Sequence, residues 1–139
     1  MVYIDTKKFN IYYKVEDIRI KSSLFEVDEL IAPIISTLNK KGYKTSFCCS
    51  GHLTSVKEKH GSEIPNDSCY IMFEKRYSIL NELPKKFKLD CNEITEDKRI
   101  IIRKYYNECN RFYEIMNTMK ELYEWVNNMK SLKSVRGSE

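Results

Sequence analysis

The stretch from Asp28 to His52, DELIAPIISTLNKKGYKTSFCCSGH, contains the two adjoining elements that decide how this chain folds. Apolar residues recur at helical spacing over Val27–Leu38, and this spacing predicts an amphipathic helix. Gly42 follows two lysines and predicts the end of that helix. The next segment, Tyr43–Cys49, alternates as a strand does, with Tyr43, Thr45, Phe47 and Cys49 expected on one face. The stretch therefore predicts a helix–turn–strand unit.

Two residues bear on where this helix begins. Asp28 is a plausible N-cap, because its carboxylate can accept hydrogen bonds from the first turn. Pro33 opposes so early a start, because proline beyond the first turn removes a backbone hydrogen bond. We expect the helix to begin nearer Ala32 or to kink at Pro33.

The remaining segments predict an α+β fold. We expect strands or extended segments at 9–15, 18–20, 69–74, 87–94 and 99–106, a short helix over 76–83 and a long C-terminal helix over 108–130. This order predicts an antiparallel or mixed sheet of four to five strands, packed by two main helices. We expect one domain over 1–130 and a flexible tail over 131–139.

Composition narrows the class of protein. The chain has 139 residues, 42% of them hydrophobic, and no stretch resembles a membrane span or a signal peptide. We therefore expect a cytoplasmic protein with no membrane partner, whose five cysteines are thiols and not disulfides. The net charge of +4 favours an anionic ligand without requiring a grip on long nucleic acid.

The turn after the predicted strand is the first candidate site. Ser50, Gly51 and His52 offer backbone amides, a hydroxyl and an imidazole, which suit the binding of a phosphate or a carboxylate. A purely structural interpretation treats this turn as a sharp strand exit with a surface histidine.

Two further interpretations of the turn remain open. Cys49 and His52 supply two possible zinc ligands, and His60 and Cys69 could complete a tetrahedral site, although the spacing matches no strong zinc pattern. Alternatively, Cys49 could be a nucleophile, for which His60 is the available partner from elsewhere in the chain. We assign no metal and no cofactor.

The second candidate site is basic and aromatic. Arg99, Arg103, Lys104 and Tyr105 lie on the predicted strand 99–106, and Tyr70 lies on the strand 69–74. If the two strands are neighbours, arginine can pair with phosphate while tyrosine stacks on a base. Solvated strand ends explain the same residues without a ligand.

Residues 30–52, including the Cys49-Ser50-Gly51-His52 turn, resemble a family of small, mostly uncharacterised bacteriophage proteins. These proteins also carry an aromatic strand like 70–74, a Leu-Pro-x2-Phe segment like 83–87 and an arginine-bearing strand like 101–104. This resemblance implies a small accessory protein without metabolic chemistry. The segment 45–51 is also similar to a turn in the wybutosine-synthesis methyltransferase-like family, which implies an enzyme that modifies a nucleotide or RNA.

Together these observations lead to one leading hypothesis. We expect a non-enzymatic, homo-oligomeric protein that sequesters a small anionic nucleotide-like signalling molecule, as a phage anti-defence sponge does. The alternatives are a nucleotide- or RNA-modifying enzyme, a cysteine-dependent hydrolase, and an adaptor that binds a host protein through the polar loop 53–68.

Overall fold

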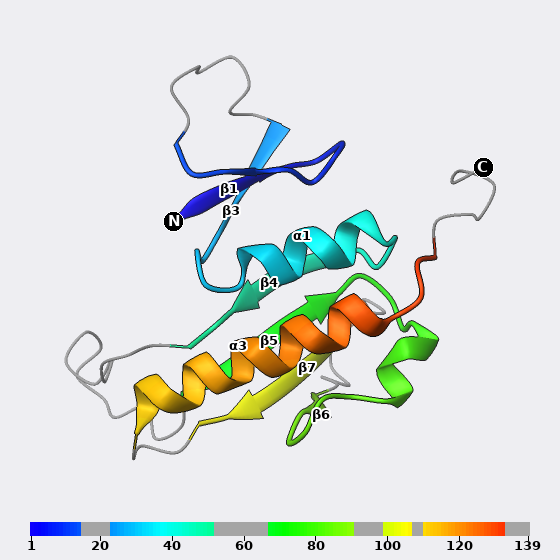
Figure 1. Cartoon of the computed structure of the whole chain (residues 1–139). Coiled ribbons are helices and arrows are strands. Elements are labelled where there is room, and N and C mark those ends of the chain that lie inside the picture. The colour runs from blue at the N-terminus through cyan, green and yellow to red at the C-terminus, as the bar shows by residue number, and fades with distance from the viewer. Residues whose placement is uncertain (15–22, 52–66, 91–98, 107–109, 133–139) are drawn as a thin grey trace.

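The computed structural model of the chain describes residues 1–14, 23–51, 67–90, 99–106 and 110–132 (Figure 1). In chain order the elements are β1 (Val2–Asp5), β2 (Ile11–Tyr12), β3 (Leu24–Val27), α1 (Ala32–Lys40), β4 (Thr45–Cys49), β5 (Ser68–Phe73), the 3₁₀ helix η2 (Ser78–Asn81), β6 (Lys88–Asp90), β7 (Ile100–Tyr105) and α3 (Arg111–Asn128). The predicted α+β class, with its two helices and its long C-terminal helix, is confirmed.

The strands form two antiparallel sheets. The larger has four strands in the order β4-β5-β7-β6, and the smaller has three in the order β2-β1-β3. Figure 1 shows α1 between the two sheets, and α1 and α3 on the same face of the four-stranded sheet. Of the small sheet, the sequence analysis anticipated only the segment around β2. The predicted strand at 18–20 lies outside the described residues.

Helix α1 begins where Pro33 requires. Ala32 is its first residue and Pro33 its second, a position where the missing N–H has no intrahelical partner to lose. The N-cap is Ile31, so the prediction that Asp28 caps the helix is wrong. The carboxylate of Asp28 accepts a hydrogen bond from the N–H of Leu30 in the turn before the helix. The helix ends at Lys40, its C-cap is Lys41, and the residue that follows, Gly42, has a φ of 98°, which suits glycine.

The core lies between the helices and the four-stranded sheet. Ile71, Phe73 and Ile102 are fully buried on the sheet, and Ile115 and Leu122 of α3 cover them. Each such side chain contributes about 1.5–3 kcal/mol through burial. The stripe predicted for α3 is partly confirmed, because Ile115, Met119, Leu122 and Val126 are buried whereas Phe112, Met116 and Tyr123 are exposed.

A β-bulge interrupts β4. Thr45 pairs with Phe73, but Phe47 pairs with Met72, so one extra residue stands between them. Because of this shift, Thr45 and Cys48 lie on the helix-covered face, while Phe47 and Cys49 point away from the helices. The prediction that Thr45 and Phe47 share a face is therefore wrong.

The ends of the two helices are joined by hydrogen bonds. The ammonium of Lys41 donates to the backbone carbonyls of Val126, Asn127 and Met129 at distances of 2.7–3.1 Å. The N–H of Leu132 donates to the carbonyl of Lys41 at 2.6 Å. Residues 133–139 lie outside the described part of the chain. No helix among the described residues is both long enough and apolar enough to cross a membrane.

Candidate functional site

The strand register gathers the candidate residues on one face of the four-stranded sheet. We call this the outer face, because α1 and α3 pack on the other side (Figure 1). Among the residues whose side chains the structure describes, alternation along each strand and pairing between strands place nine there: Phe47, Cys49, Ser68, Tyr70, Met72, Lys88, Ile101, Arg103 and Tyr105.

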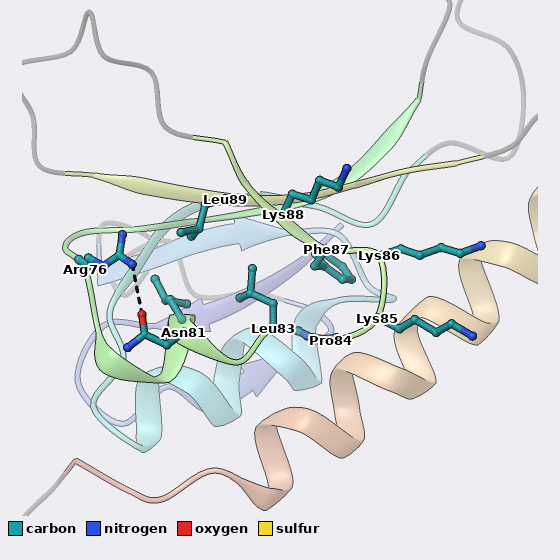
Figure 2. Close-up of a pocket in the computed structure, with 10 residues that line it drawn as sticks. Arg76, Asn81, Leu83, Pro84, Lys85, Lys86, Phe87, Lys88 and Leu89 are labelled. Atoms are coloured by element: carbon teal, nitrogen blue, oxygen red, sulfur yellow. Dashed lines mark hydrogen bonds between the residues drawn. The ribbon is translucent and has the colours of Figure 1, made fainter.

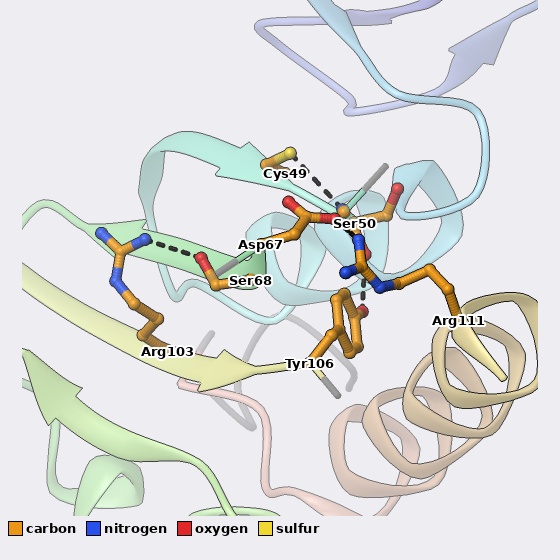
Figure 3. Close-up of polar contacts among 8 residues, drawn as sticks. Cys49, Ser50, Asp67, Ser68, Arg103, Tyr106 and Arg111 are labelled. Carbon is orange, nitrogen blue, oxygen red and sulfur yellow. Dashed lines mark hydrogen bonds and ion pairs between the residues drawn. The ribbon is translucent and has the colours of Figure 1, made fainter. Parts of the chain in front are cut away.

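Arg103 occupies the middle of the outer face. Its guanidinium carbon lies 4.8 Å from the centre of the Tyr70 ring and 5.9 Å from that of Tyr105. Its Nη1 donates to the hydroxyl of Ser68 at 2.8 Å (Figure 3). Cation–π contacts of this kind contribute about 0.5–1 kcal/mol each at exposed sites. The arginine is therefore held in place before any ligand binds.

Two aromatic rings of the outer face are largely exposed. The exposed fraction is 60% for Phe47 and 59% for Tyr105. Tyr105 lies beside Arg103 on β7, and Lys88 of the edge strand β6 pairs with Arg103. The outer face thus combines flat apolar surfaces with positive charge, which is the combination that binds nucleobases and phosphates. Sequence analysis did not single out Phe47 or Lys88, because the bulge and the edge pairing are absent from local patterns.

The structure brings three predicted residues together and separates two others from them. Tyr70, Arg103 and Tyr105 converge on the outer face. Lys104 points to the helix-covered side, where it is 6% exposed and donates from Nζ to the hydroxyl of Thr118 at 2.6 Å. Consecutive residues of a strand alternate, so Arg103 and Lys104 cannot share a face. Arg99 precedes the opposite end of β7.

The polar groups of the turn after β4 form hydrogen bonds with other residues of the same chain. Ser50 is 1% exposed, its hydroxyl hydrogen-bonds to the carboxylate of Asp28, and its carbonyl accepts from the hydroxyl of Tyr106 at 2.5 Å. The N–H of Gly51 donates to Sγ of Cys49 at 3.4 Å. Ser50 and Gly51, which the sequence analysis assigned to anion binding, therefore serve the packing of the turn. His52 lies outside the described residues.

A partly buried polar network packs against this turn. Arg111 at the start of α3 forms an ion pair with Asp67 at 2.9 Å, and the guanidinium lies 6.0 Å from the Tyr106 ring (Figure 3). The N–H of Tyr106 donates to the carbonyl of Asp67 at 2.8 Å. Sequence reasoning missed Asp67 and Arg111, because only the tertiary fold brings these residues together.

The cysteine chemistry is set by burial. Burial raises the pKa of the Cys48 and Cys69 thiols to about 12, and it also raises the pKa of Cys49. All three thiols are protonated at neutral pH, whereas the thiolate is the nucleophile and the metal ligand. Within the described ranges no three His, Cys, Asp or Glu residues lie close enough to hold a metal ion. His60, the remaining partner suggested by the sequence, lies outside those ranges.

A shallow groove of about 600 Å³ lies at the edge of the four-stranded sheet, between η2 and β6 (Figure 2). Its rim carries Arg76, Lys85, Lys86 and Lys88, and its floor is mainly apolar. Lys88 belongs to both the groove and the outer face. Because stacking requires a flat, exposed ring and not a cavity, we place the candidate site on the outer face, with the groove as its basic border.

Comparison of the chain with family models, with curated proteins and with solved structures finds no match. The case for a function therefore depends on the geometry of the outer face.

Proposed function

We propose that this protein binds a small anionic, nucleotide-like ligand on the outer face and releases it chemically unchanged. The observation that carries the proposal is the position of the Arg103 guanidinium, between the rings of Tyr70 and Tyr105. A base stacks on the exposed ring of Tyr105 while the phosphate accepts hydrogen bonds from Arg103. The guanidinium carries five N–H donors, so Arg103 can donate to Ser68 and to a phosphate at the same time.

The charge distribution supports an anionic ligand. Lys88 lies next to Arg103 in the pairing of β6 with β7, and the groove beside it adds three more cationic side chains. No carboxylate lines that groove among the residues described. Positive charge therefore continues from the outer face around the edge of the sheet.

The thiols favour binding over catalysis. A cysteine-dependent hydrolase needs a thiolate at neutral pH, and burial raises the pKa of all three described thiols. The setting that we propose is the host-cell cytoplasm, where a phage-encoded protein of this kind would sequester a nucleotide signal of the host's defence. The resemblance of residues 30–52 to small phage proteins supports this setting.

We also propose that the protein forms a homo-oligomer through α3. Phe112, Met116 and Tyr123 form an exposed apolar stripe along the helix, with exposed fractions of 64%, 43% and 50%. Lys120 and Glu124, one turn apart, lie along one side of the stripe. A second copy packed antiparallel about a two-fold axis at the middle of the stripe sets each Phe112 opposite the partner subunit's Tyr123, as an isologous interface requires.

Two measurements test the proposed ligand binding. Calorimetric titration of mononucleotides, cyclic di- and trinucleotides and ADP-ribose isomers should find a ligand, and mass spectrometry should recover that ligand unaltered. Arg103→Ala should lower its affinity by roughly 10- to 100-fold, because a hydrogen bond to a charged group contributes about 1.5–3 kcal/mol. Lys7→Ala, which removes a charge from the turn after β1, should leave affinity unchanged. Flat titrations across the whole panel would remove the proposed function.

The oligomer is tested separately. Light scattering should report more than one copy per particle, and Met116→Glu should reduce the mass to that of a monomer while the fold remains intact. A monomeric wild-type protein at concentrations of tens of micromolar would contradict the α3 interface.

A further inference from the structure

The outer face carries three aromatic side chains on one diagonal. Phe47 on β4 pairs with Met72, two residues along β5 from Tyr70. Tyr70 in turn pairs with Arg103, two residues along β7 from Tyr105. The diagonal therefore places one ring on each of three neighbouring strands. Diagonal neighbours lie about 7–8 Å apart, so Phe47 and Tyr105 are separated by about 15 Å.

The middle ring differs from the two end rings. Arg103 lies over Tyr70, with its guanidinium carbon 4.8 Å from the ring centre, and thereby covers a face of that ring. Phe47 and Tyr105 each expose about three-fifths of their side chains. Along the diagonal the order of groups is therefore ring, cation, ring.

From this order we infer that the ligand of the outer face is an oligonucleotide with at least two unpaired bases, one on Phe47 and one on Tyr105. Its connecting phosphodiester lies against Arg103. This inference rests on the proposed function and specifies its ligand class. A mononucleotide has a single base, linked through its sugar to its own phosphate, so it can use Tyr105 and Arg103 but cannot also reach Phe47. The same chemistry occurs in a linear single strand and in a cyclic oligonucleotide.

The β-bulge in β4 supports the role of Phe47 independently. Without the extra residue, alternation would place Phe47 on the same face as Thr45, under the helices. The bulge turns a large aromatic ring outward on an edge strand, where 60% of the residue stays exposed. Bulges that redirect a side chain in this way are commonly found at functional sites.

The size of the sheet limits the ligand. The outer face is four strands wide, and the two end rings lie on β4 and β7. One common RNA-binding module is also a four-stranded sheet, and the aromatic residues on one of its faces stack two or three bases. We therefore expect a ligand of two to four nucleotides, with Lys88 on β6 next to Arg103 for a further phosphate.

Fluorescence or calorimetric titration of a matched series tests the inference: AMP, the linear di-, tri- and tetranucleotides of adenosine, and cyclic di- and triadenylate. We expect affinity to rise at least tenfold from AMP to the oligonucleotide that binds most tightly. Comparison of the linear with the cyclic oligonucleotides should show which of these two forms is the ligand. Phe47→Ala should weaken oligonucleotide binding by roughly fivefold to a hundredfold, the effect of losing one base–aromatic stack, and should leave AMP binding unchanged.

Phe47 is largely exposed, so the Ala variant should fold, and Phe47→Tyr should restore oligonucleotide affinity. If AMP binds as tightly as every oligonucleotide, or if Phe47→Ala has no effect, the inference is overturned while the proposed function stands. If no nucleotide binds at all, both fall.

Discussion

The substitution Gly51→Ala tests directly how the turn after β4 is built. Gly51 has a φ of 109°, and a Cβ at this position would lie 2.2 Å from Cε2 of Tyr106. The alanine therefore has to adopt a backbone conformation that L-residues avoid, and the tyrosine ring has to move. When the ring moves, the carbonyl of Ser50, a residue that is 1% exposed, loses the hydroxyl of Tyr106.

The expected cost is the sum of two effects. A residue held in a disfavoured backbone conformation costs about 1–3 kcal/mol. A buried acceptor left without its donor costs about another 1–3 kcal/mol. We therefore expect Gly51→Ala to lower the free energy of unfolding by about 4 kcal/mol. For a chain of this length, this corresponds to a fall in Tm of about 12 °C.

Urea unfolding followed by circular dichroism measures this loss. Gly42→Ala is the matched control, because Gly42 also has a positive φ, 98°, and the control therefore reports the backbone cost. Gly51→Ala should be about 2 kcal/mol more destabilising than the control. Equal losses in the two variants would refute the close contact between Gly51 and Tyr106. Ligand affinity, measured well below Tm, should be unchanged in Gly51→Ala, because this residue lies off the outer face.

Three further predictions concern other parts of the molecule. Lys41→Met should lower the free energy of unfolding by about 1–3 kcal/mol, because three carbonyls at the end of α3 lose their donor. An unchanged midpoint of urea unfolding would show that these hydrogen bonds do not stabilise the fold. Lys104→Met should also reduce stability but leave nucleotide affinity within twofold of wild type, and a loss as large as that in Arg103→Ala would place Lys104 in the site. Burial raises the pKa of Cys48 and Cys69 above that of an unfolded thiol, so their contribution to stability is complete below about pH 8.5 and is lost as pH rises towards 12. The urea concentration at the midpoint of unfolding should therefore be lower at pH 10.5 than at pH 8. This decrease should be smaller when both cysteines are replaced by alanine, and an identical decrease in the double variant would assign the effect to other groups.

Much of the α+β fold could be predicted, because its signals are local. Pro33 and Gly42 delimit α1 through backbone restrictions that act within a few residues. The apolar spacing of α3 predicts its buried face for the same reason. The three-stranded sheet was largely missed, because β1, β2 and β3 are short and each becomes a strand only by pairing with the others.

The candidate site was harder to predict than the fold. Tyr70, Arg103 and Tyr105 were found from residue type alone, since arginine beside tyrosine suggests stacking and charge. Lys104 has the same local character, and yet the pleat of β7 buries it against Thr118. Phe47 gave no signal, because a strict alternation places it in the core and the bulge that exposes it has no recognisable pattern in β4.

The amino-acid sequence by itself determined the main helices, the four-stranded sheet's principal segments and the kinds of side chain available for an anionic, aromatic ligand. Only the tertiary structure decided which of those side chains meet. Strand pairing joins β4, β5 and β7, which are far apart in the chain, and the register of that pairing sets the face on which each side chain lies. A shift of one residue moves a side chain from solvent to core, and such shifts depend on pairing between distant strands that no local pattern encodes.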